Sequence, residues 1–91
     1  MEIIFSNNFV RRLSSLKKRN KKLIDRFQNK LEIFKDNPRH NSLRLHKLEG
    51  NLGNYWSMSI DRKIRVVFRF DEINNVCDFV DIGSHDEVYR K

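Results

Sequence analysis

The segment Lys63-Ile64-Arg65-Val66-Val67-Phe68-Arg69-Phe70 decides the fold that we expect for this chain. Its residues alternate with period two between an apolar side and a largely cationic side. The apolar side comprises Ile64, Val66, Phe68 and Phe70. The other side comprises Lys63, Arg65, Val67 and Arg69. This alternation predicts a half-buried strand whose outer face carries positive charge.

Two further strands are predicted on either side of this segment. Residues 55–60 place Trp56, Met58 and Ile60 on one side, and Asp61 and Arg62 then form a short connection that fits a tight hairpin. Residues 76–82 read as a third strand that ends at Gly83. A histidine and a tyrosine, His85 and Tyr89, follow that strand directly.

The N-terminal half predicts one short strand and two helices. Residues 2–5 (EIIF) read as a short strand, and Ser6, Asn7 and Asn8 each offer a helix N-cap. Apolar residues then recur at helical spacing up to a break at Asn20. The second helix should end by Asn37, because the residue before a proline is disfavoured in the helical region.

These elements predict a single α+β domain over residues 1–91. The expected order is β-α-α-β-β-β, with an antiparallel sheet packed on one face by the helical hairpin. Residues 38–53 give no clear assignment, and residues 49–54, which include Gly50 and Gly53, read as a loop.

The composition limits the partners and the compartment. The formal net charge of +7 over 91 residues favours a polyanionic partner, which could be nucleic acid, an acidic protein or an anionic membrane surface. The single cysteine, Cys77, cannot form an internal disulfide bond, and a reducing interior is its simplest setting. Because no run of 18 apolar residues and no signal-peptide pattern occurs, we expect a cytoplasmic protein.

The basic residues form two groups. The first surrounds the expected turn between the helices, where it would contact RNA or would simply be a solvated helix face; it comprises Lys17, Lys18, Arg19, Lys21 and Lys22. The second belongs to the outer face and rim of the sheet, which the helices should leave open. It comprises Arg44, Lys47, Arg62, Lys63, Arg65, Arg69 and Arg90.

Common catalytic and metal-binding motifs are absent from the sequence. No phosphate-binding loop, no HExxH motif and no cysteine pair at zinc spacing occurs. The remaining arginine, histidine and tyrosine residues are the groups that RNA cleavage without metal requires. In that reaction the ribose 2′-OH attacks phosphorus, while an acid and a base move protons and a cation stabilises the phosphorane.

Four residues are candidates for these roles. Imidazoles titrate near pH 6.5, so His85 and His46 suit proton transfer, and Arg65 can grip a phosphate with two hydrogen bonds. Tyr89 could stack on a base or orient the phosphate. Structural alternatives remain for each: His85 as a helix cap, His46 as an exposed residue, Tyr89 as core packing, and Arg65 paired across strands with Asp78 or Asp81.

Four segments in sequence order resemble the RelE/ParE superfamily of bacterial toxins. They are residues 45–50 (LHKLEG), 56–60 (WSMSI), 64–68 (IRVVF) and 82–89 (IGSHDEVY). The branch that the chain resembles most is the YafQ-like or RelE/StbE-like toxins of type II toxin–antitoxin modules.

The resemblance implies a microbial RNase fold, cleavage of mRNA in the ribosomal A site without a cofactor, and a cognate antitoxin that blocks a free toxin expected to be monomeric. His46, His85, Tyr89 and Arg65 match the family's functional positions. Ser59 stands where the YafQ-like branch has a further histidine, and Lys63-Ile64 stands where it has Asp-Trp. These departures leave the acid and the base unassigned. The resemblance also allows the ParE branch, whose members inhibit DNA gyrase.

Overall fold

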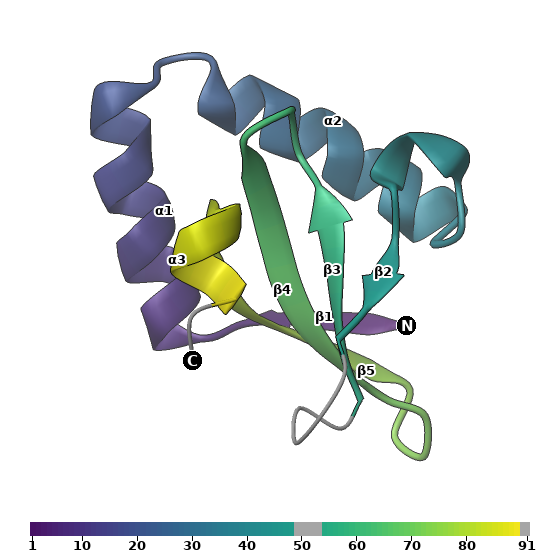
Figure 1. Cartoon of the computed structure of the whole chain (residues 1–91). Helices are drawn as coiled ribbons and strands as arrows, with labels where there is room; N and C mark the ends of the chain where they lie inside the picture. The colour runs from purple at the N-terminus through teal and green to yellow at the C-terminus, as the bar shows by residue number, and fades with distance from the viewer. Residues whose placement is uncertain (49–53, 90–91) are drawn as a thin grey trace.

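A computed structural model describes residues 1–48 and 54–89 of the chain (Figure 1). The elements in order are β1 (Glu2–Phe5), α1 (Asn7–Arg19), α2 (Leu23–Asp36), a short 3-10 helix η1 (Asn41–Leu43), β2 (His46–Lys47), β3 (Tyr55–Ser59), β4 (Ile64–Asp71), β5 (Val76–Ser84) and α3 (His85–Tyr89). The predicted α+β class and the predicted order of its main elements are confirmed. The structure adds β2, η1 and α3. The loop expected at 49–53 and the rim residue Arg90 lie outside the described residues.

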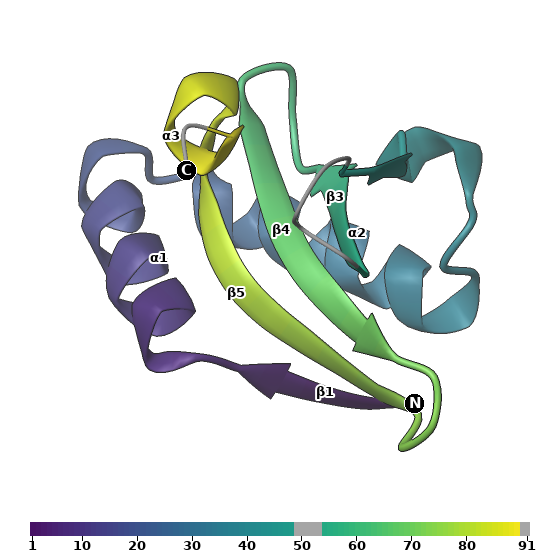
Figure 2. The ribbon, with the colours of Figure 1, turned by 60° about the horizontal axis from the view of Figure 1, so that its bottom comes forward.

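The sheet is mixed, whereas the sequence led us to expect an antiparallel one. Its strand order is β1-β5-β4-β3-β2. The pairs β2–β3, β3–β4 and β4–β5 are antiparallel, but β1 runs parallel to β5, from Glu2 opposite Val76 to Phe5 opposite Phe79. Figure 2 shows β1 lying along β5 at one edge. A parallel pair needs a long crossover connection, and nearly the whole chain provides it here.

The helix ends follow the predicted capping residues. Ser6 is the N-cap of α1, and its hydroxyl accepts a hydrogen bond from the Phe9 amide at 3.1 Å. Asn20 and Asn37 are the C-caps of α1 and α2, in extended conformations that stop each helix. Both ends of α1 and the end of α2 were therefore predictable from local sequence, whereas α2 begins after Lys22, whose side chain makes no capping hydrogen bond.

Both long helices pack on one face of the sheet and bury an aromatic core. The rings of Phe9, Phe27, Phe34, Phe68 and Phe79 contact one another at centroid separations of 5.1 to 6.3 Å. This range is typical of edge-on and tilted aromatic pairs, which add to the free energy gained by burial. The apolar side predicted for 63–70 faces this core.

The outer face of the sheet is only partly open, which corrects the expectation that the helices would leave it free. Val67, the one apolar residue on the predicted cationic side, is 5% exposed and packs with Leu48 and Val88 in a second, smaller cluster. Val88 belongs to α3, which therefore packs on the face opposite to α1 and α2. This small cluster fixes α3 against the outer face.

The β3–β4 hairpin is wider than predicted. The strands end at Ser59 and resume at Ile64, so four residues connect them. The carboxylate of Asp61 accepts hydrogen bonds from the Lys63 and Ile64 amides, both at 2.8 Å. An aspartate side chain that bonds to backbone two and three residues later is a common way to stabilise a turn without glycine.

Candidate nuclease site

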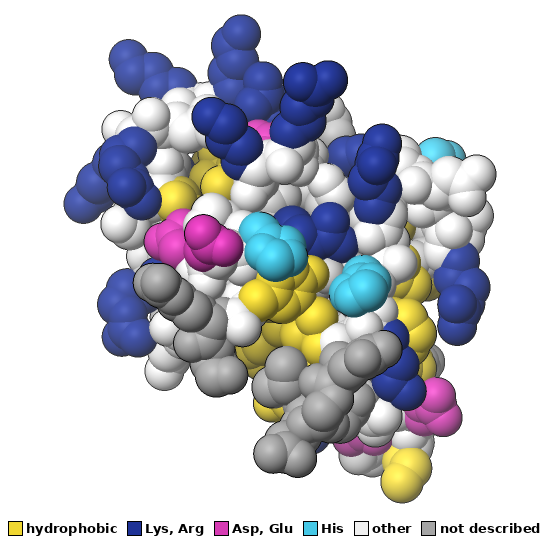
Figure 3. Space-filling view, in the orientation of Figure 1, with side chains coloured by type: hydrophobic (Ala, Val, Ile, Leu, Met, Phe, Trp, Pro, Cys, Tyr) yellow, Lys and Arg dark blue, Asp and Glu magenta, His cyan; other side chains and the backbone are white. Residues whose placement is uncertain are grey.

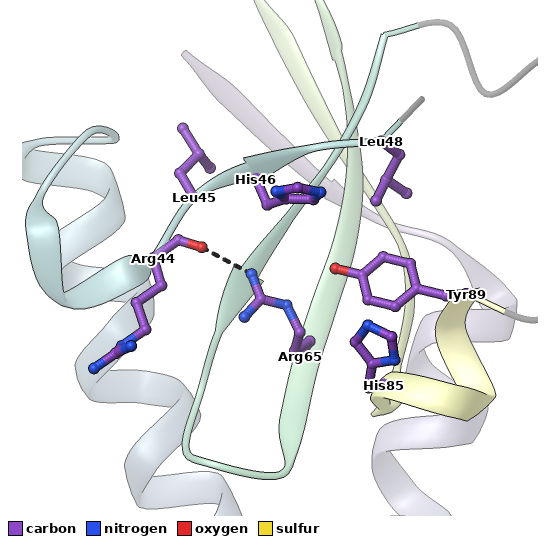
Figure 4. A pocket seen from close by; sticks show the side chains of 7 residues that line it. All are labelled: Arg44, Leu45, His46, Leu48, Arg65, His85 and Tyr89. Atoms are coloured by element: carbon purple, nitrogen blue, oxygen red, sulfur yellow. Dashed lines mark hydrogen bonds between the residues drawn. The ribbon is translucent and has the colours of Figure 1, made fainter. Parts of the chain in front are cut away.

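An open pocket of about 770 Å³ lies between β2, the start of β4 and α3 (Figure 4). Its lining brings together all four residues proposed from the sequence for catalysis, which come from three separate parts of the chain. The lining residues are Arg44, Leu45, His46, Leu48, Arg65, His85 and Tyr89. In the space-filling view, two histidine side chains flank a basic side chain on this face (Figure 3).

His85 is placed by the N-terminal cap of α3. The Ser84 amide donates to Glu87 Oε1 at 2.9 Å, and the Glu87 amide donates to Ser84 Oγ at 3.3 Å. This reciprocal pair is a capping box, and it starts the helix at His85. The hydrogen bond from the Ser84 amide is the main cause that lowers the pKa of Glu87 below its usual value. His85 itself projects into solvent, with a side chain 73% exposed.

Arg12 of α1 ties this cap to the sheet. Its Nε lies 3.2 Å from Asp81 Oδ1, and its Nη2 lies 3.4 Å from Glu87 Oε2. Its Nε also donates to the Ile82 carbonyl at 3.3 Å. Gly83 makes this approach possible, because a Cβ there would lie 2.7 Å from Arg12 Nη2.

Arg65 is held by two contacts at the floor of the pocket. Its Nε donates to Ser57 Oγ at 3.1 Å, and its Nη2 donates to the Arg44 carbonyl at 2.8 Å. Arg44 adopts the left-handed conformation (φ 47°, ψ 52°) as it ends η1. These two bonds use two of the five N–H donors of a guanidinium, so its remaining donors can serve an anion.

The acidic residues considered as cross-strand partners of Arg65 form their ion pairs with other arginines. Asp78 Oδ2 lies 3.9 Å from Arg69 Nη2, and Asp81 pairs with Arg12. The contacts of Arg65 itself are with a hydroxyl and a carbonyl. Within residues 1–48 and 54–89 no carboxylate is ion-paired with Arg65, so its positive charge is available to the pocket.

Tyr89 is fixed at both ends of its side chain. Its hydroxyl is hydrogen-bonded to Ser57 Oγ, and its ring packs on the small cluster of Val67, Leu48 and Val88. The His85 ring meets the Tyr89 ring edge-on, with centroids 4.2 Å apart and an interplanar angle of 62°. Tyr89 therefore both packs against this cluster and lines the pocket, two roles that the sequence left as alternatives.

His46 enters the pocket from the opposite side, on the two-residue edge strand β2. It is exposed, and its Cα is paired with Ser57 in the sheet register. His40 lies outside the pocket that holds His46. Its Nδ1 accepts a hydrogen bond from the Ser42 amide at 3.1 Å, which caps η1.

None of the nine residues proposed for RNA binding is among the described residues that line the pocket. Lys47 Nζ is 5.7 Å from the Trp56 ring centroid, and Arg69 pairs with Asp78. Arg62 and Lys63 line a separate hollow of about 680 Å³ with Asn20 at the α1–α2 junction. Five further basic side chains of the group are exposed at or beside that junction: Lys17, Lys18, Arg19, Lys21 and Lys22. Figure 3 shows basic side chains gathered at this end of the molecule.

Three structural supports of the pocket were not identified from the sequence. Ser57 is fully buried and joins Arg65 to Tyr89, although we saw no role for it in the sequence. The alternation along β3 could have indicated that Ser57 lies on the outer face of the sheet, as Arg65 does. The Ser84–Glu87 spacing was another signal, since [ST]-x-x-[DE] marks a capping box. Nothing local to Arg12 indicates its contact with Glu87, which is 75 residues away.

Two further properties of the described residues concern function. In residues 1–48 and 54–89, no three His, Cys, Asp or Glu side chains cluster closely enough to hold a metal ion. Of the helices in those same ranges, none has both the length and the apolar character of a membrane span.

The sequence pattern of the family described as "ParE toxin of type II toxin-antitoxin system, parDE" matches residues 3–89. The chain therefore belongs to this family of toxins, within the RelE/ParE superfamily. It is 34% identical over 79 residues to a Methanocaldococcus jannaschii protein named "Putative toxin RelE4", covering 87% of this chain and 80% of that protein.

Solved structures share the fold at low sequence identity. YafQ in the Escherichia coli DinJ–YafQ complex superposes with a TM-score of 0.81 at 14% identity, covering 97% of both chains. The "YoeB/ParE toxin" from Agrobacterium tumefaciens gives a TM-score of 0.78 at 15% identity, covering 93% of this chain and 99% of that one. These structures confirm the predicted fold, and the family match over residues 3–89 confirms the predicted superfamily.

Proposed function

We propose that this toxin is an endoribonuclease that cleaves mRNA, in the cytoplasm and at the ribosome. The observation that carries the proposal is the convergence of His46, Arg65, His85 and Tyr89 on one open pocket. The arrangement has room for a phosphodiester between two imidazoles, with a guanidinium at its floor (Figure 4).

The chemistry would proceed through attack of the ribose 2′-OH on the adjacent phosphorus. One imidazole accepts the proton of the 2′-OH, and the other protonates the 5′ oxygen that leaves, so that a 2′,3′-cyclic phosphate and a 5′-OH result. His85 and His46 are suited to these two transfers because they lie on opposite sides of the pocket. A positioned acid or base contributes roughly 10²–10⁴-fold to such a rate.

Arg65 would stabilise the dianionic phosphorane. Its guanidinium is held in advance by Ser57 and Arg44, so little reorganisation is required when negative charge develops. Tyr89 would orient the substrate, either by stacking on a base or by a hydrogen bond from its hydroxyl to the phosphate. All of these steps use protein groups alone.

Mapping mRNA 5′ ends by primer extension after induction in a bacterium tests the proposal. We expect new cuts within reading frames for the wild type and none for His85→Ala. Arg65→Ala should lower the cleavage rate about 10²–10³-fold, which is the usual cost of removing a transition-state donor. Full growth arrest by His85→Ala, with the same cuts as the wild type, would falsify the catalytic assignment.

Gyrase inhibition is the second candidate, because the family pattern that matches residues 3–89 is that of ParE toxins. A gyrase inhibitor would arrest growth with intact messages, stalled replication and induced DNA damage. It would also keep its potency in the His85→Ala variant, provided that the pocket is not its contact surface. The 5′-end map and a gyrase supercoiling assay therefore separate the two functions.

An antitoxin is the partner that the family implies, and YafQ is known in complex with DinJ. We propose an acidic antitoxin segment that covers the positive surface, since this chain carries a net charge of +7. Co-expression should suppress toxicity and give a heteromeric complex whose association rate falls with increasing salt.

A further inference from the structure

We propose that a second hollow, beside the catalytic pocket, binds the base of a nucleotide adjacent to the scissile phosphate, with Trp56 as the stacking surface. This inference rests on the proposed nuclease function. The hollow has a volume of about 320 Å³, and its lining residues are Arg39, His40, Asn41, Arg44, Leu45 and Trp56.

The two hollows are neighbours. Arg44 and Leu45 line both of them, so a strand of RNA that leaves the catalytic pocket on this side reaches Trp56. Arg44 serves both: its carbonyl holds Arg65, while its guanidinium is directed away from His85 and Tyr89 (Figure 4).

The indole of Trp56 has the surroundings of a base-stacking site. It is half-buried against the core, which fixes the ring, and two cations lie over it. Arg39 Cζ is 5.9 Å and Lys47 Nζ is 5.7 Å from the ring centroid. Aromatic rings and guanidinium planes are the surfaces on which proteins stack unpaired bases, and nearby cations attract the phosphates.

The polar groups that line the hollow suit a nucleotide better than they suit an acidic peptide. Asn41 and His40 can hydrogen-bond to base edges, and none of the described residues that line the hollow is acidic. An exposed cation–π pair would explain Arg39 and Lys47 as simple surface packing. Such surface packing would not explain why the hollow shares Arg44 and Leu45 with the catalytic pocket.

Trp56 is the only tryptophan of the chain, so its fluorescence reports directly on this hollow. Single-stranded 2′-O-methyl oligonucleotides are suitable probes, because they lack the attacking hydroxyl and cannot be cleaved. We expect saturable quenching of Trp56 emission on titration into the full chain. In a series of probes with one abasic position each, quenching should be lost at one position only.

Matched variants separate stacking from general charge. Arg39→Ala should raise the Kd of the probe about tenfold, whereas Arg11→Ala, which removes the same charge from an exposed position of α1, should change it about twofold or less. Trp56→Leu keeps an apolar residue but removes the aromatic ring on which one base would stack. Its Kd for the probe, measured by fluorescence anisotropy, should rise roughly 5- to 100-fold. Circular dichroism confirms that each variant folds.

The proposal fails if anisotropy shows binding while Trp56 emission stays constant, if no probe binds, or if only an antitoxin quenches Trp56. These outcomes are independent of the cleavage assay. Quenching without cleavage would support the nucleotide subsite and contradict the nuclease function. Cleavage without quenching would support the nuclease function and contradict the subsite.

Discussion

At the scale of single residues, the site depends on a serine that has no chemical step of its own. Ser57 accepts a hydrogen bond from Arg65 Nε and is bonded to the Tyr89 hydroxyl, and it is fully buried. Two groups that would meet the substrate are therefore fixed relative to each other through one oxygen atom. We regard Ser57 as a positioning residue.

Replacement of Ser57 by alanine should lower kcat/KM for RNA cleavage roughly 10- to 100-fold, because displacements of about 1 Å in a positioned group have effects of this size. The free energy of unfolding should fall by about 1 kcal/mol, since one hydrogen-bond acceptor is removed. Ser59→Ala is the matched control. Ser59 lies two residues further along β3, but its hydroxyl donates to the Asp61 carbonyl. Equal losses of activity in both variants would contradict the positioning role.

At the scale of elements, α3 is the part on which the pocket depends most. It is only five residues long and carries both His85 and Tyr89. Helices this short are not stable alone in water, so its geometry must come from the cap and from tertiary contacts. The Ser84–Glu87 cap, the Arg12 contacts and the burial of Val88 supply them.

The pH dependence of this element follows from Glu87. Its pKa is lowered from 4.5 in the folded chain, first by the hydrogen bond from the Ser84 amide. Its stabilising contribution is therefore complete above the unfolded value and is lost as the pH falls below about 4.5 and through the folded value. NMR titration of the Glu87 carboxyl should give a midpoint below 4.5, accompanied by a shift of the Ser84 amide. Glu87→Gln should abolish that amide transition, and a Ser84 amide that still titrates in the variant would show that another group is responsible.

Elements whose limits depend on neighbouring residues could be predicted from the sequence, and contacts between distant segments could not. Ser6, Asn20 and Asn37 mark helix ends by local capping, and the period-two pattern of 63–70 identifies the central strand. The parallel pairing of β1 with β5 joins residues 74 positions apart. The packing of α3 on the outer face joins Val88 to Val67 and Leu48, which lie 21 and 40 positions away. The catalytic candidates came from residue type and family resemblance, whereas their supports, Ser57 and Arg12, required the three-dimensional structure.

At the scale of the whole molecule, one thiol reports on the stability of the core. Cys77 is completely buried in the aromatic core, and burial raises its pKa to about 12. At pH 8 the native thiol should react with a disulfide reagent at least about a thousandfold more slowly than in denaturant, because a global opening of about 5 kcal/mol or more must come first. Rapid labelling of the native chain would show that β5 opens locally.

The distribution of charge over the molecule leads to a last prediction. Basic side chains from the α1–α2 junction and the β3–β4 hairpin lie at one end, away from the lining of the candidate pocket. If this end contacts RNA phosphates, removing its charges should weaken binding and flatten the salt dependence without changing the rate of cleavage in the bound complex.

Two double variants with the same change in net charge test that idea. Lys18→Gln/Lys21→Gln removes two charges at the junction, and Arg11→Gln/Lys35→Gln removes two elsewhere on the same helices. We expect the first to lower the slope of log K against log salt by about 0.7 to 0.9 for each phosphate that is no longer neutralised, and the second to leave it nearly unchanged. Single-turnover cleavage at saturating ribosome concentration should be equal in both. Equal slopes would mean that net charge, and not the position of these lysines, governs the association.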